Sequence, residues 1–486
     1  MVAEKRTLTI FQALFPIVIL IVLLFINVML FDDTQEGATQ VILMFVAGLV
    51  GLLGYRIGYR WNEMRSQIVK TISTSMPAIL ILLMIGALSG TWLISGVVPA
   101  LIYYGLSFLS PVIFLFAAVV ISAVVSLATG SSWSTIATIG VALIGIGNAM
   151  GFNEAIVAGA IISGAYFGDK MSPLSDTTNL APAVAGTDLF THIKYMVFTT
   201  VPSMTITLII FLIIGFNHDS SVFISQGDEV KEIISSTFNI SPWLFLVPVI
   251  LFTVIILKVP PLPALAVGVL LGAVFAVIFQ PQIIENLTNS TGNYFRDSYI
   301  VTLKSIYGST SIDTGNAKVN ELFSTGGMTG MLSTIWLILS AMFLGGMMEA
   351  TGMLKKITTS ILSLVKSDSS LVASTAVSCI FFNITAADQY MSIVIPGEMY
   401  KEAYKDRNLK PEVLSRTLED SGTVTSVLVP WNSGGATQAR VLGVPTLDYL
   451  PFAFFNIISP IMTVLFAYFK IKIRKFKTKD EVLASN

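Results

Sequence analysis

Apolar runs of about 20 residues, separated by short polar segments, recur along the whole chain. A helix of that length can cross the hydrocarbon core of a bilayer, where each backbone group must find its hydrogen-bond partner inside the segment. The pattern therefore predicts an all-α, polytopic membrane protein. Ten spans are expected, near residues 10–31, 40–58, 75–93, 111–128, 190–215, 242–258, 262–280, 331–350, 368–385 and 450–469.

Two stretches interrupt this pattern with Pro, Ser, Thr, Asn, Gly and acidic residues where a spanning helix should continue. They are Gly164 to Asp188 and Glu419 to Gly443. Irregular backbone at membrane depth is tolerated only where it is buried in protein or lines a polar cavity. We therefore expect both stretches to form walls of a substrate site.

The two stretches are related by an internal repeat. Shifting the chain by 257 residues places MSPLSDTTNLAPAVAG on LVPWNSGGATQARVLG, and GSSWSTIATIG on ADQYMSIVIPG, without a gap. The helix-breaking residues coincide, with Pro173 on Pro430 and Gly186 on Gly443. The sequence thus predicts two structural repeats.

Charge predicts that the two repeats have opposite orientations. Segment 398–412 contains four Lys and Arg residues, whereas its counterpart 141–155 contains none, and basic loops mark the cytoplasmic side. Inverted-topology repeats place substrate near the membrane midplane, between discontinuous helices. We expect re-entrant helical hairpins with tips at 128–133 and 385–389, and broken helices at 172–179 and 430–437.

The predicted organisation follows from these assignments. Lys5, Arg6 and the basic tail place both termini in the cytoplasm. The expected divisions are a first inverted repeat at 1–216, with scaffold spans in 10–93 and transport segments in 111–187; an extracellular connection at 217–241; a second inverted repeat at 242–469, with scaffold spans in 242–350 and transport segments in 368–446; and a basic cytoplasmic tail at 470–486.

Hard oxygen donors are concentrated at the predicted tips and breaks, and such donors suit hard cations. We expect a Na⁺ site at Asp176, Ser175, Thr177 and Asn179, with Asp388 as the leading partner in the opposite half. Asp, Ser or Thr at a break can instead serve as helix caps. The other expected ion or substrate ligands are Ser131, Ser132, Thr385, Asn432, Ser433 and Thr437.

Ionisable residues inside apolar segments are functional candidates because burying them is costly. A buried carboxyl group that holds either a proton or a cation in turn can couple the two as an exchange. The proton-coupling candidates are Asp169, Asp176, Asp388, Glu419 and Asp420.

Other interpretations of the charged residues remain open. Asp169 and the adjacent Lys170 can form a buried structural pair. Glu419 and Asp420 can form a solvated face near the cytoplasmic mouth. His192 lies near a span entry, and we expect it to be interfacial rather than a proton relay.

Two further residues, Arg440 and Gln438, are candidates for binding an organic substrate. Arg440 can contact a carboxylate, or it can be an interfacial arginine whose charged end reaches water.

Composition limits the classes of function. With 54% hydrophobic and 12% charged residues and a net charge of −1, a nucleic-acid partner is not expected. The single cysteine, Cys379, cannot form an internal disulfide. The chain lacks HExxH and GxSxG motifs, so an intramembrane enzyme is disfavoured, and paired breaks disfavour a passive channel. No cofactor is expected beyond Na⁺ and H⁺ as transported or coupling ions.

Two motifs carry a resemblance to a known family. TGSSWSTIATIG, followed by ISGAYFGDKMSPLSDTTNLAPAVAGTDLFTHIKYM, resembles the NhaC family of sodium/proton antiporters, which includes malate/lactate antiporters. The resemblance implies a bacterial cytoplasmic-membrane carrier of the elevator type, with two hairpins and two broken helices in its moving domain, and a homodimer. We therefore expect Na⁺/H⁺ antiport, with coupled exchange of a small organic anion (malate or lactate) or an amino acid as the alternative.

Overall fold

The computed structural model describes residues 8–31, 37–217, 221–288 and 292–476. Lys5, Arg6 and the tail beyond residue 476 lie outside the described residues. The described chain is mostly helical, and labels with η mark 3-10 and π turns. In the first half the helices are α1 (Ile10–Leu30), α2 (Ala38–Ile57), α3 (Trp61–Ile94), α4 (Val97–Phe108), α5 (Pro111–Thr129), α6 (Ser132–Thr135), η1 (Ile136–Gly140), α7 (Val141–Ala149), α8 (Glu154–Met171), α9 (Asp176–Ala185) and α10 (Leu189–Phe216).

The second half begins with helices that the sequence pattern treats as connections and scaffold. These elements are α11 (Ser221–Thr237), η2 (Pro242–Phe245), α12 (Leu246–Ile256), α13 (Pro261–Phe279), α14 (Pro281–Thr288), α15 (Tyr294–Tyr307), β1 (Thr310–Ser311), α16 (Ala317–Leu322), β2 (Ser324–Thr325), η3 (Thr329–Met331), α17 (Leu332–Ala350) and α18 (Met353–Leu362). The two strands pair antiparallel, with Thr310 opposite Thr325.

The chain ends with α19 (Asp368–Thr385), α20 (Gln389–Asp406), α21 (Pro411–Leu418), η4 (Glu419–Thr423), η5 (Ser426–Leu428), α22 (Ser433–Leu442), α23 (Thr446–Tyr449), η6 (Leu450–Phe452) and α24 (Phe454–Tyr468). Each of the ten predicted spans coincides with a helix. Two details differ from the prediction. The polar segments 217–241 and 281–329 contain α11, α14, α15 and α16, and a small strand pair accompanies the helices.

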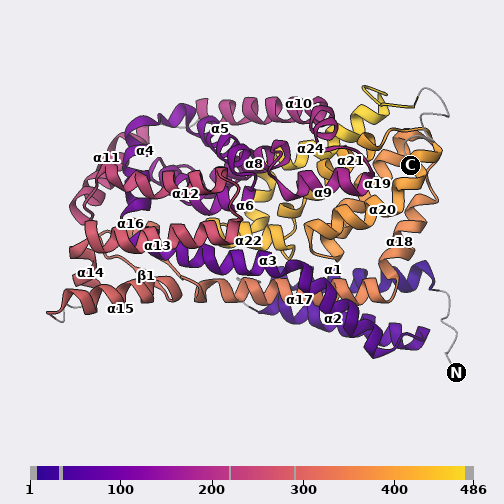
Figure 1. The fold of residues 1–486 in the computed structure, drawn as a ribbon, viewed down its shortest axis with the longest axis horizontal. Helices are drawn as coiled ribbons and strands as arrows, with labels where there is room; N and C mark the ends of the chain where they lie inside the picture. The colour runs from indigo at the N-terminus through magenta and orange to yellow at the C-terminus, as the bar shows by residue number, and fades with distance from the viewer. Residues whose placement is uncertain (1–7, 32–36, 218–220, 289–291, 477–486) are drawn as a thin grey trace.

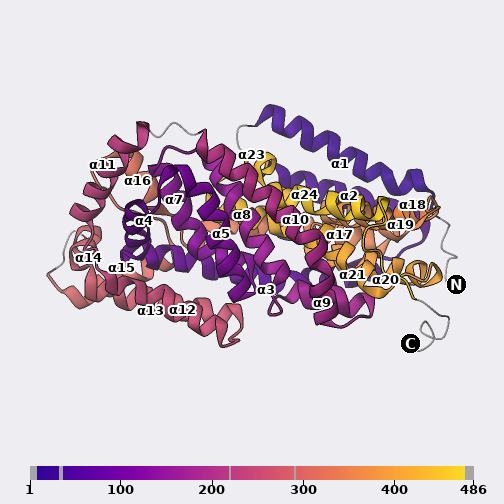
Figure 2. The same ribbon diagram turned by 90° about the horizontal axis from the view of Figure 1, so that it is seen from above.

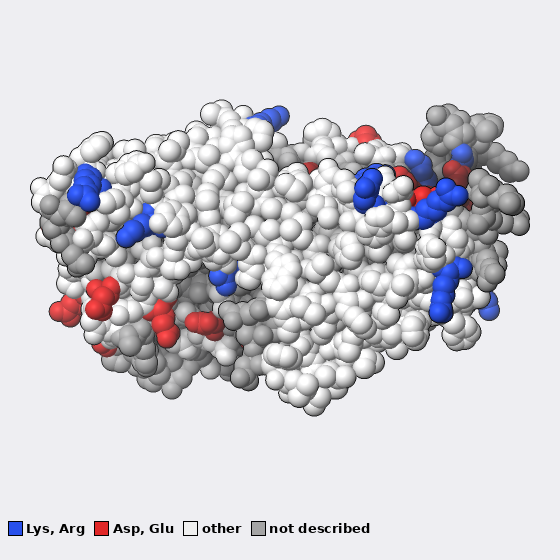
Figure 3. All heavy atoms as spheres, turned by 90° about the horizontal axis from the view of Figure 1, so that it is seen from below, with Lys and Arg blue, Asp and Glu red and all other residues white. Residues whose placement is uncertain are grey.

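Eight helices of the described chain are long and apolar enough to cross a membrane, or up to ten if two bent pairs each form one span. On the face in Figure 3, charged residues gather mainly toward the two ends of the long axis, and the surface between them is largely uncharged. In Figure 1 the described chain begins, at α1, and ends, after α24, toward the same end of the molecule. The multi-pass membrane architecture predicted from hydropathy is thereby confirmed at this level.

The helices pack as two groups. One group joins α17 to α2 and α3, and α3 also packs against α13 and α15. In the other group α5 packs on α8 and α10, while α20 and α21 contact α9, and α24 contacts α10 and α19. Figures 1 and 2 show α18 to α21 near the termini and α4 and α7 toward the opposite end.

Helix boundaries recur at a constant offset of 257 residues. The C-terminal glycines Gly186 and Gly443, which both adopt left-handed conformations (φ 88° and 71°), follow this offset. Such glycines end helices without the steric penalty of a Cβ atom. The paired helix starts are Pro111 and Asp368, Ser132 and Gln389, Glu154 and Pro411, Asp176 and Ser433, and Leu189 and Thr446.

The two helix breaks differ from their predicted bounds. The first lies between Met171 and Asp176, and α9 resumes inside the predicted interval 172–179. The second follows η4, contains only the short turn η5 and ends at Asn432, so most of the predicted interval 430–437 is helical. The reason is the same at both sites, since Ser175 and Asn432 are N-caps that begin the next helix.

Candidate functional site

At the first break, side chains form hydrogen bonds with backbone groups that have no partner within a helix. Ser172 Oγ donates to the carbonyl of Leu127 at 2.8 Å. Asn179 Nδ2 donates to the carbonyls of Ser175 (2.6 Å) and Pro173 (3.0 Å), and Ser175 Oγ accepts from the Thr178 amide at 3.3 Å. Asn179 and Ser175, two of the predicted Na⁺ ligands, therefore have structural roles in this conformation.

The first hairpin tip lies against this break. Gly130 adopts φ 70° between α5 and α6, and Ser131 Oγ accepts from the Ser134 amide at 3.2 Å. The next residue, Ser132, donates to Asp169 Oδ2 from its amide (3.1 Å) and its hydroxyl (2.6 Å). The second oxygen, Asp169 Oδ1, is buried and has no hydrogen-bond partner among the described residues. The tip therefore binds one oxygen of the buried Asp169 carboxylate, and no described residue binds the other oxygen.

The second hairpin tip is closed by Asp388. Its Oδ1 accepts from the amides of Tyr390 (2.9 Å) and Met391 (3.0 Å), which makes it the N-cap of α20. Its Oδ2 accepts from Ser75 Oγ of α3 at 3.2 Å. In this conformation the predicted partner of Asp176 is therefore a buried helix cap tied to the other packing group.

The second break is fastened to that hairpin. Asn432 Nδ2 donates to the backbone carbonyl (3.0 Å) and side-chain oxygen (3.1 Å) of Asn383, and the Ser433 amide donates to the Ala387 carbonyl at 3.0 Å. Thr385 Oγ1 donates back to the Phe381 carbonyl at 2.8 Å. Most of the predicted ligands at this break form hydrogen bonds with backbone groups or with one another. Within the described chain, Thr437 Oγ1 and both amide atoms of Gln438 are buried without a hydrogen-bond partner.

A fully buried ion pair connects the two repeats. Lys170 Nζ pairs with Asp420, and both side chains are completely inaccessible to solvent. Asp420 also accepts from Thr199 Oγ1 at 2.8 Å and from Thr463, while Ser459 Oγ lies 3.1 Å from Lys170 Nζ.

This geometry corrects two interpretations. Lys170 pairs with Asp420 of the other half rather than with Asp169, because consecutive residues of a helix do not face each other. Glu419 and Asp420 are fully buried and do not form a solvated face.

Glu419 lies beside the first break. Its Oε1 accepts from Thr177 Oγ1 at 3.2 Å, and Thr177 Oγ1 lies 3.1 Å from Ser175 Oγ. Its Oε2 is buried, with no hydrogen-bond partner in the described part of the chain. Glu419 also interacts electrostatically with Lys170 and, less strongly, with Asp169. Two buried carboxylates, one from each repeat, thus lie within electrostatic reach, each with one oxygen that no described protein group binds.

Asp176, the leading ion ligand in the prediction, is exposed on the protein surface. Its Oδ1 accepts from the Thr177 amide at 2.9 Å, and its Oδ2 accepts from the Tyr390 hydroxyl. Because Tyr390 follows Asp388 by two residues, the predicted acids of the two halves lie in one region. Tyr390 and Ser75, which tie these acids to other helices, were missed by sequence analysis, since nothing local distinguishes them.

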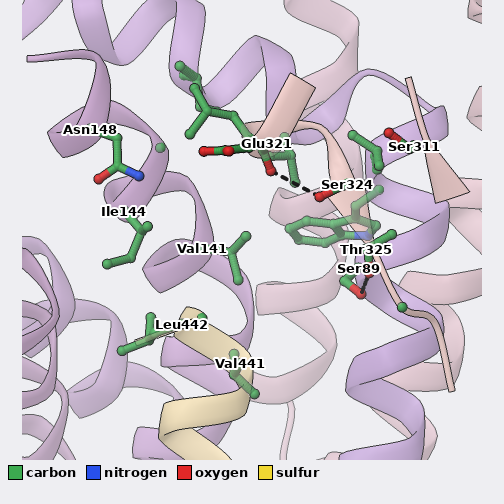
Figure 4. A pocket seen from close by; sticks show the side chains of 18 of the residues that line it. Ser89, Val141, Ile144, Asn148, Ser311, Glu321, Ser324, Thr325, Val441 and Leu442 are labelled. Carbon is green, nitrogen blue, oxygen red and sulfur yellow. Dashed lines mark hydrogen bonds between the residues drawn. The ribbon is translucent and has the colours of Figure 1, made fainter. Parts of the chain in front are cut away.

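A cavity of about 1260 Å³ lies on the far side of α22, between α3, α7 and the β1–β2 segment. Figure 4 shows Asn148 and Ile144 of α7, Val441 and Leu442 of α22, and the polar side chains of Glu321, Ser324 and Thr325 around it. Arg440 also lines the cavity, with its guanidinium close to Gly326 and Gly330, and Gln438 is buried two residues earlier. The cavity is far larger than a dehydrated cation.

His192 is fully buried, so the expectation of an interfacial residue was wrong. Its Nδ1 lies 2.8 Å from Ser415 Oγ of α21. The apolar surroundings of the α10 entrance suggested an interface, but the packing of α21 on α10 covers this residue.

Paired hairpins and broken helices around buried carboxylates, inside a bundle of apolar spans, are the features of a secondary transporter. The chain belongs to the Na⁺/H⁺ antiporter family, whose model matches residues 164–471. The resemblance found in the two sequence motifs is thereby confirmed.

Three relatives show how similar proteins are described. The chain is 38% identical to the Na⁺/H⁺ antiporter NhaC of Alkalihalophilus pseudofirmus, over 90% of each chain. It is 37% identical to the arginine/ornithine antiporter ArcD of Halobacterium salinarum, over 94% of this chain and 91% of that one. It is 35% identical to the malate-2H⁺/Na⁺-lactate antiporter of Bacillus subtilis, over 94% of each chain.

Proposed function

We propose that this protein exchanges Na⁺ for H⁺ across a bacterial cytoplasmic membrane by alternating access. The observation that carries the proposal is the pair of buried carboxylates, Asp169 and Glu419, each with one oxygen that has no partner among the described residues. An isolated buried negative charge is costly, so each carboxyl group needs a proton or a cation. Competition between the two for one site is the basis of antiport.

The Na⁺ site would be formed at the first break. Asp169 and Glu419 supply carboxylate oxygens, and Ser132, Ser175 and Thr177 supply hydroxyl oxygens that already contact these carboxylates or one another. Oxygen ligands of this kind suit a hard cation. Compared with the ligands expected from sequence, the site retains Ser175 and Thr177 and shifts the carboxylates from Asp176 to Asp169 and Glu419.

We also propose that two inverted repeats move this site by an elevator mechanism. Support comes from the constant offset between helix boundaries and from the two packing groups, one of which contains both hairpins and both breaks. Basic residues are more numerous in 398–412 than in 141–155, which favours a cytoplasmic location for the end that carries the termini. The homodimer remains an expectation from the family resemblance.

A second cargo is favoured by one observation. Arg440 lines a cavity large enough for a small organic solute, and a guanidinium binds carboxylates in a bidentate manner. Relatives of this chain include antiporters named for malate, lactate, arginine and ornithine. The alternative is therefore coupled exchange of a small carboxylate or amino acid.

Proton flux in proteoliposomes tests the proposal, with Na⁺, malate, lactate, arginine and ornithine each offered alone. We expect Na⁺ to drive proton flux, and Glu419→Gln and Asp169→Asn to abolish it. Exposed acids provide matched controls, since Glu402→Gln and Asp448→Asn should leave the flux unchanged. Proton flux driven only by an organic solute would favour the alternative cargo. Na⁺ flux without countertransport would indicate a channel and contradict the proposal.

A further inference from the structure

A seam of buried polar side chains runs between α10 and α21–η4 and ends at Asp420, next to the proposed Na⁺ ligand Glu419. On α10 it contains His192, Tyr195 and Thr199, which lie on one face because they are three and four residues apart. On α21–η4 it contains Glu412, Arg416 and Asp420, also at spacings of four. These two helical segments pack against each other, and all six side chains are buried.

The inner end of the seam is the buried ion pair. Asp420 binds Lys170 and accepts from Thr199 Oγ1 of α10 at 2.8 Å. The outer end lies toward the C-terminal segment, where Arg474 NH1 donates to Glu412 Oε1 at 3.2 Å. Because the ring of Tyr195 lies between the guanidinium groups of Arg416 (4.5 Å) and Arg474 (4.9 Å), the outer end is closed by stacked side chains.

His192 lies in this seam between its inner and outer ends, and its ring has one free acceptor. Ser415 Oγ donates to the backbone carbonyl of Glu412 at 3.3 Å, so the ring contact of 2.8 Å is best satisfied by a His192 Nδ1–H that donates to Ser415 Oγ. In that tautomer Nε2 carries the lone pair. Nε2 is buried and has no hydrogen-bond partner within the described residues.

We propose that His192 relays protons between Asp420 and the outer end of the seam at Arg474. This inference rests on the proposed antiport function. A proton binds at Nε2 to form the imidazolium, then leaves Nε2 for the Asp420 carboxylate, which releases its ion pair with Lys170 as it is neutralised. His192 and Thr199, which donates to Asp420, are seven residues apart, about 10 Å along the helix, so the proposed transfer requires that water enter the seam transiently.

The charges around His192 suit transient protonation. Burial disfavours a positive imidazolium most strongly, Asp420 attracts it, and Lys170 repels it. Arg416, which follows Ser415 on α21, is a second buried cation with no hydrogen-bond partner in the described chain, and Glu412 is bound to Arg474. One attractive and two repulsive charges favour a proton that passes through rather than one that is retained.

Two transport modes measured on the same proteoliposomes test the relay. His192→Asn keeps an amide donor for Ser415 but cannot carry a proton. We expect Na⁺-driven proton flux to fall about tenfold or more, while exchange of radioactive Na⁺ for Na⁺, which moves no proton, stays within about twofold of wild type. The exposed neighbour Lys194 provides the control, since Lys194→Gln should change neither mode.

The outcomes separate this inference from the function on which it rests. Absence of Na⁺-driven proton flux in the wild type would overturn the proposed antiport. If the wild type shows Na⁺-driven proton flux and His192→Asn shows the same flux, the relay is overturned. An equal loss of both transport modes in His192→Asn would also overturn the relay, because it would indicate a structural role. Should His192→Asn fail to reach the membrane, Ser415→Ala replaces it. Loss of the hydrogen bond that orients the ring should then lower proton flux and spare Na⁺ exchange, and unchanged flux would overturn the relay.

Discussion

The two helix breaks share a backbone design and differ in their chemistry. Each ends at an N-cap, Ser175 or Asn432, followed by a ten-residue helix and a left-handed glycine. The first break has a carboxylate on each side, Asp169 and Asp176, whereas the second has Glu419 and Asp420 before it and no acid in the helix that follows. The two breaks therefore share a local backbone pattern, but their charges differ.

This difference explains how one site can be assembled from both halves. The counterpart of Asp169 at the 257-residue offset is the uncharged Ser426, whose Oγ donates to Gln389 Oε1 at 3.2 Å. Lys170 forms its ion pair with Asp420, so among the described residues the carboxylates of Asp169 and Glu419 form no ion pair, although Lys170 also acts electrostatically on Glu419. Because the two breaks carry different charges, the cation site that we propose includes carboxylates at the first break and at η4 but none in α22.

Removal of the Lys170 ammonium group, which pairs with Asp420, should have the largest effect on stability. Lys170→Met leaves the Asp420 carboxylate buried without its partner, which should lower the free energy of unfolding by about 3–5 kcal/mol. Thermal unfolding in detergent measures this effect. The double variant Lys170→Met/Asp420→Asn removes both charges and should recover most of the loss. A single variant as stable as wild type would show that the pair does not hold the halves together.

Next in size is the contrast between the two acids of the first break. Asp169→Asn should weaken Na⁺ binding about tenfold to hundredfold, since a charge-assisted contact contributes ~1.5–3 kcal/mol. Asp176 is exposed, so Asp176→Asn should weaken binding by no more than about fivefold. Calorimetric titration with NaCl measures both affinities. The reverse order would return the leading role to Asp176.

The two hairpin tips provide a smaller and oppositely signed pair. A Cβ atom at Gly130 would lie 2.6 Å from Leu174 Cβ in a left-handed backbone, so Gly130→Ala should destabilise by about 2 kcal/mol. Ala387 already adopts φ 56°, so Ala387→Gly should relieve strain and stabilise by up to about 1 kcal/mol. We expect the two variants to shift the thermal midpoint in opposite directions. Shifts of the same sign would contradict the inference that both hairpin tips require a left-handed backbone.

Changes to the caps should have the smallest effects. Ser175→Ala removes the oxygen that accepts from the Thr178 amide, and Asn432→Asp keeps the cap but loses the donor to Asn383. Each should lower the free energy of unfolding by about 1 kcal/mol. Thermal unfolding of both variants checks the values. Ser175→Thr, which keeps a capping hydroxyl, should retain most of the wild-type stability, and a loss as large as that of Ser175→Ala would contradict the capping role.

The periodicity of apolar residues and the positions of helix-breaking residues predict the helices of this protein well. Apolar runs locate ten helices, and the offset that aligns Pro173 with Pro430 also aligns the helix starts. This works because span length and capping are local properties, set by the bilayer and by side chains within a few residues.

The chemistry of the site is less predictable, because it depends on packing between distant residues. Lys170 and Asp420 are 250 positions apart, and no local pattern shows that Lys170 points away from its neighbour Asp169. The pattern also cannot distinguish a capping carboxylate such as Asp388 from a ligand, since both occur where a helix begins. Burial of His192 follows only from the placement of α21 on α10.

The most direct test of the central claim counts the protons that Na⁺ displaces. Calorimetric titration of the detergent-solubilised protein with NaCl, in buffers of different ionisation enthalpy, measures proton release on binding. We predict that Na⁺ releases protons from the wild type, that its affinity falls as pH is lowered, and that Glu419→Gln eliminates the release. Na⁺ binding of equal affinity at every pH, with no proton released, would contradict competition at Asp169 and Glu419.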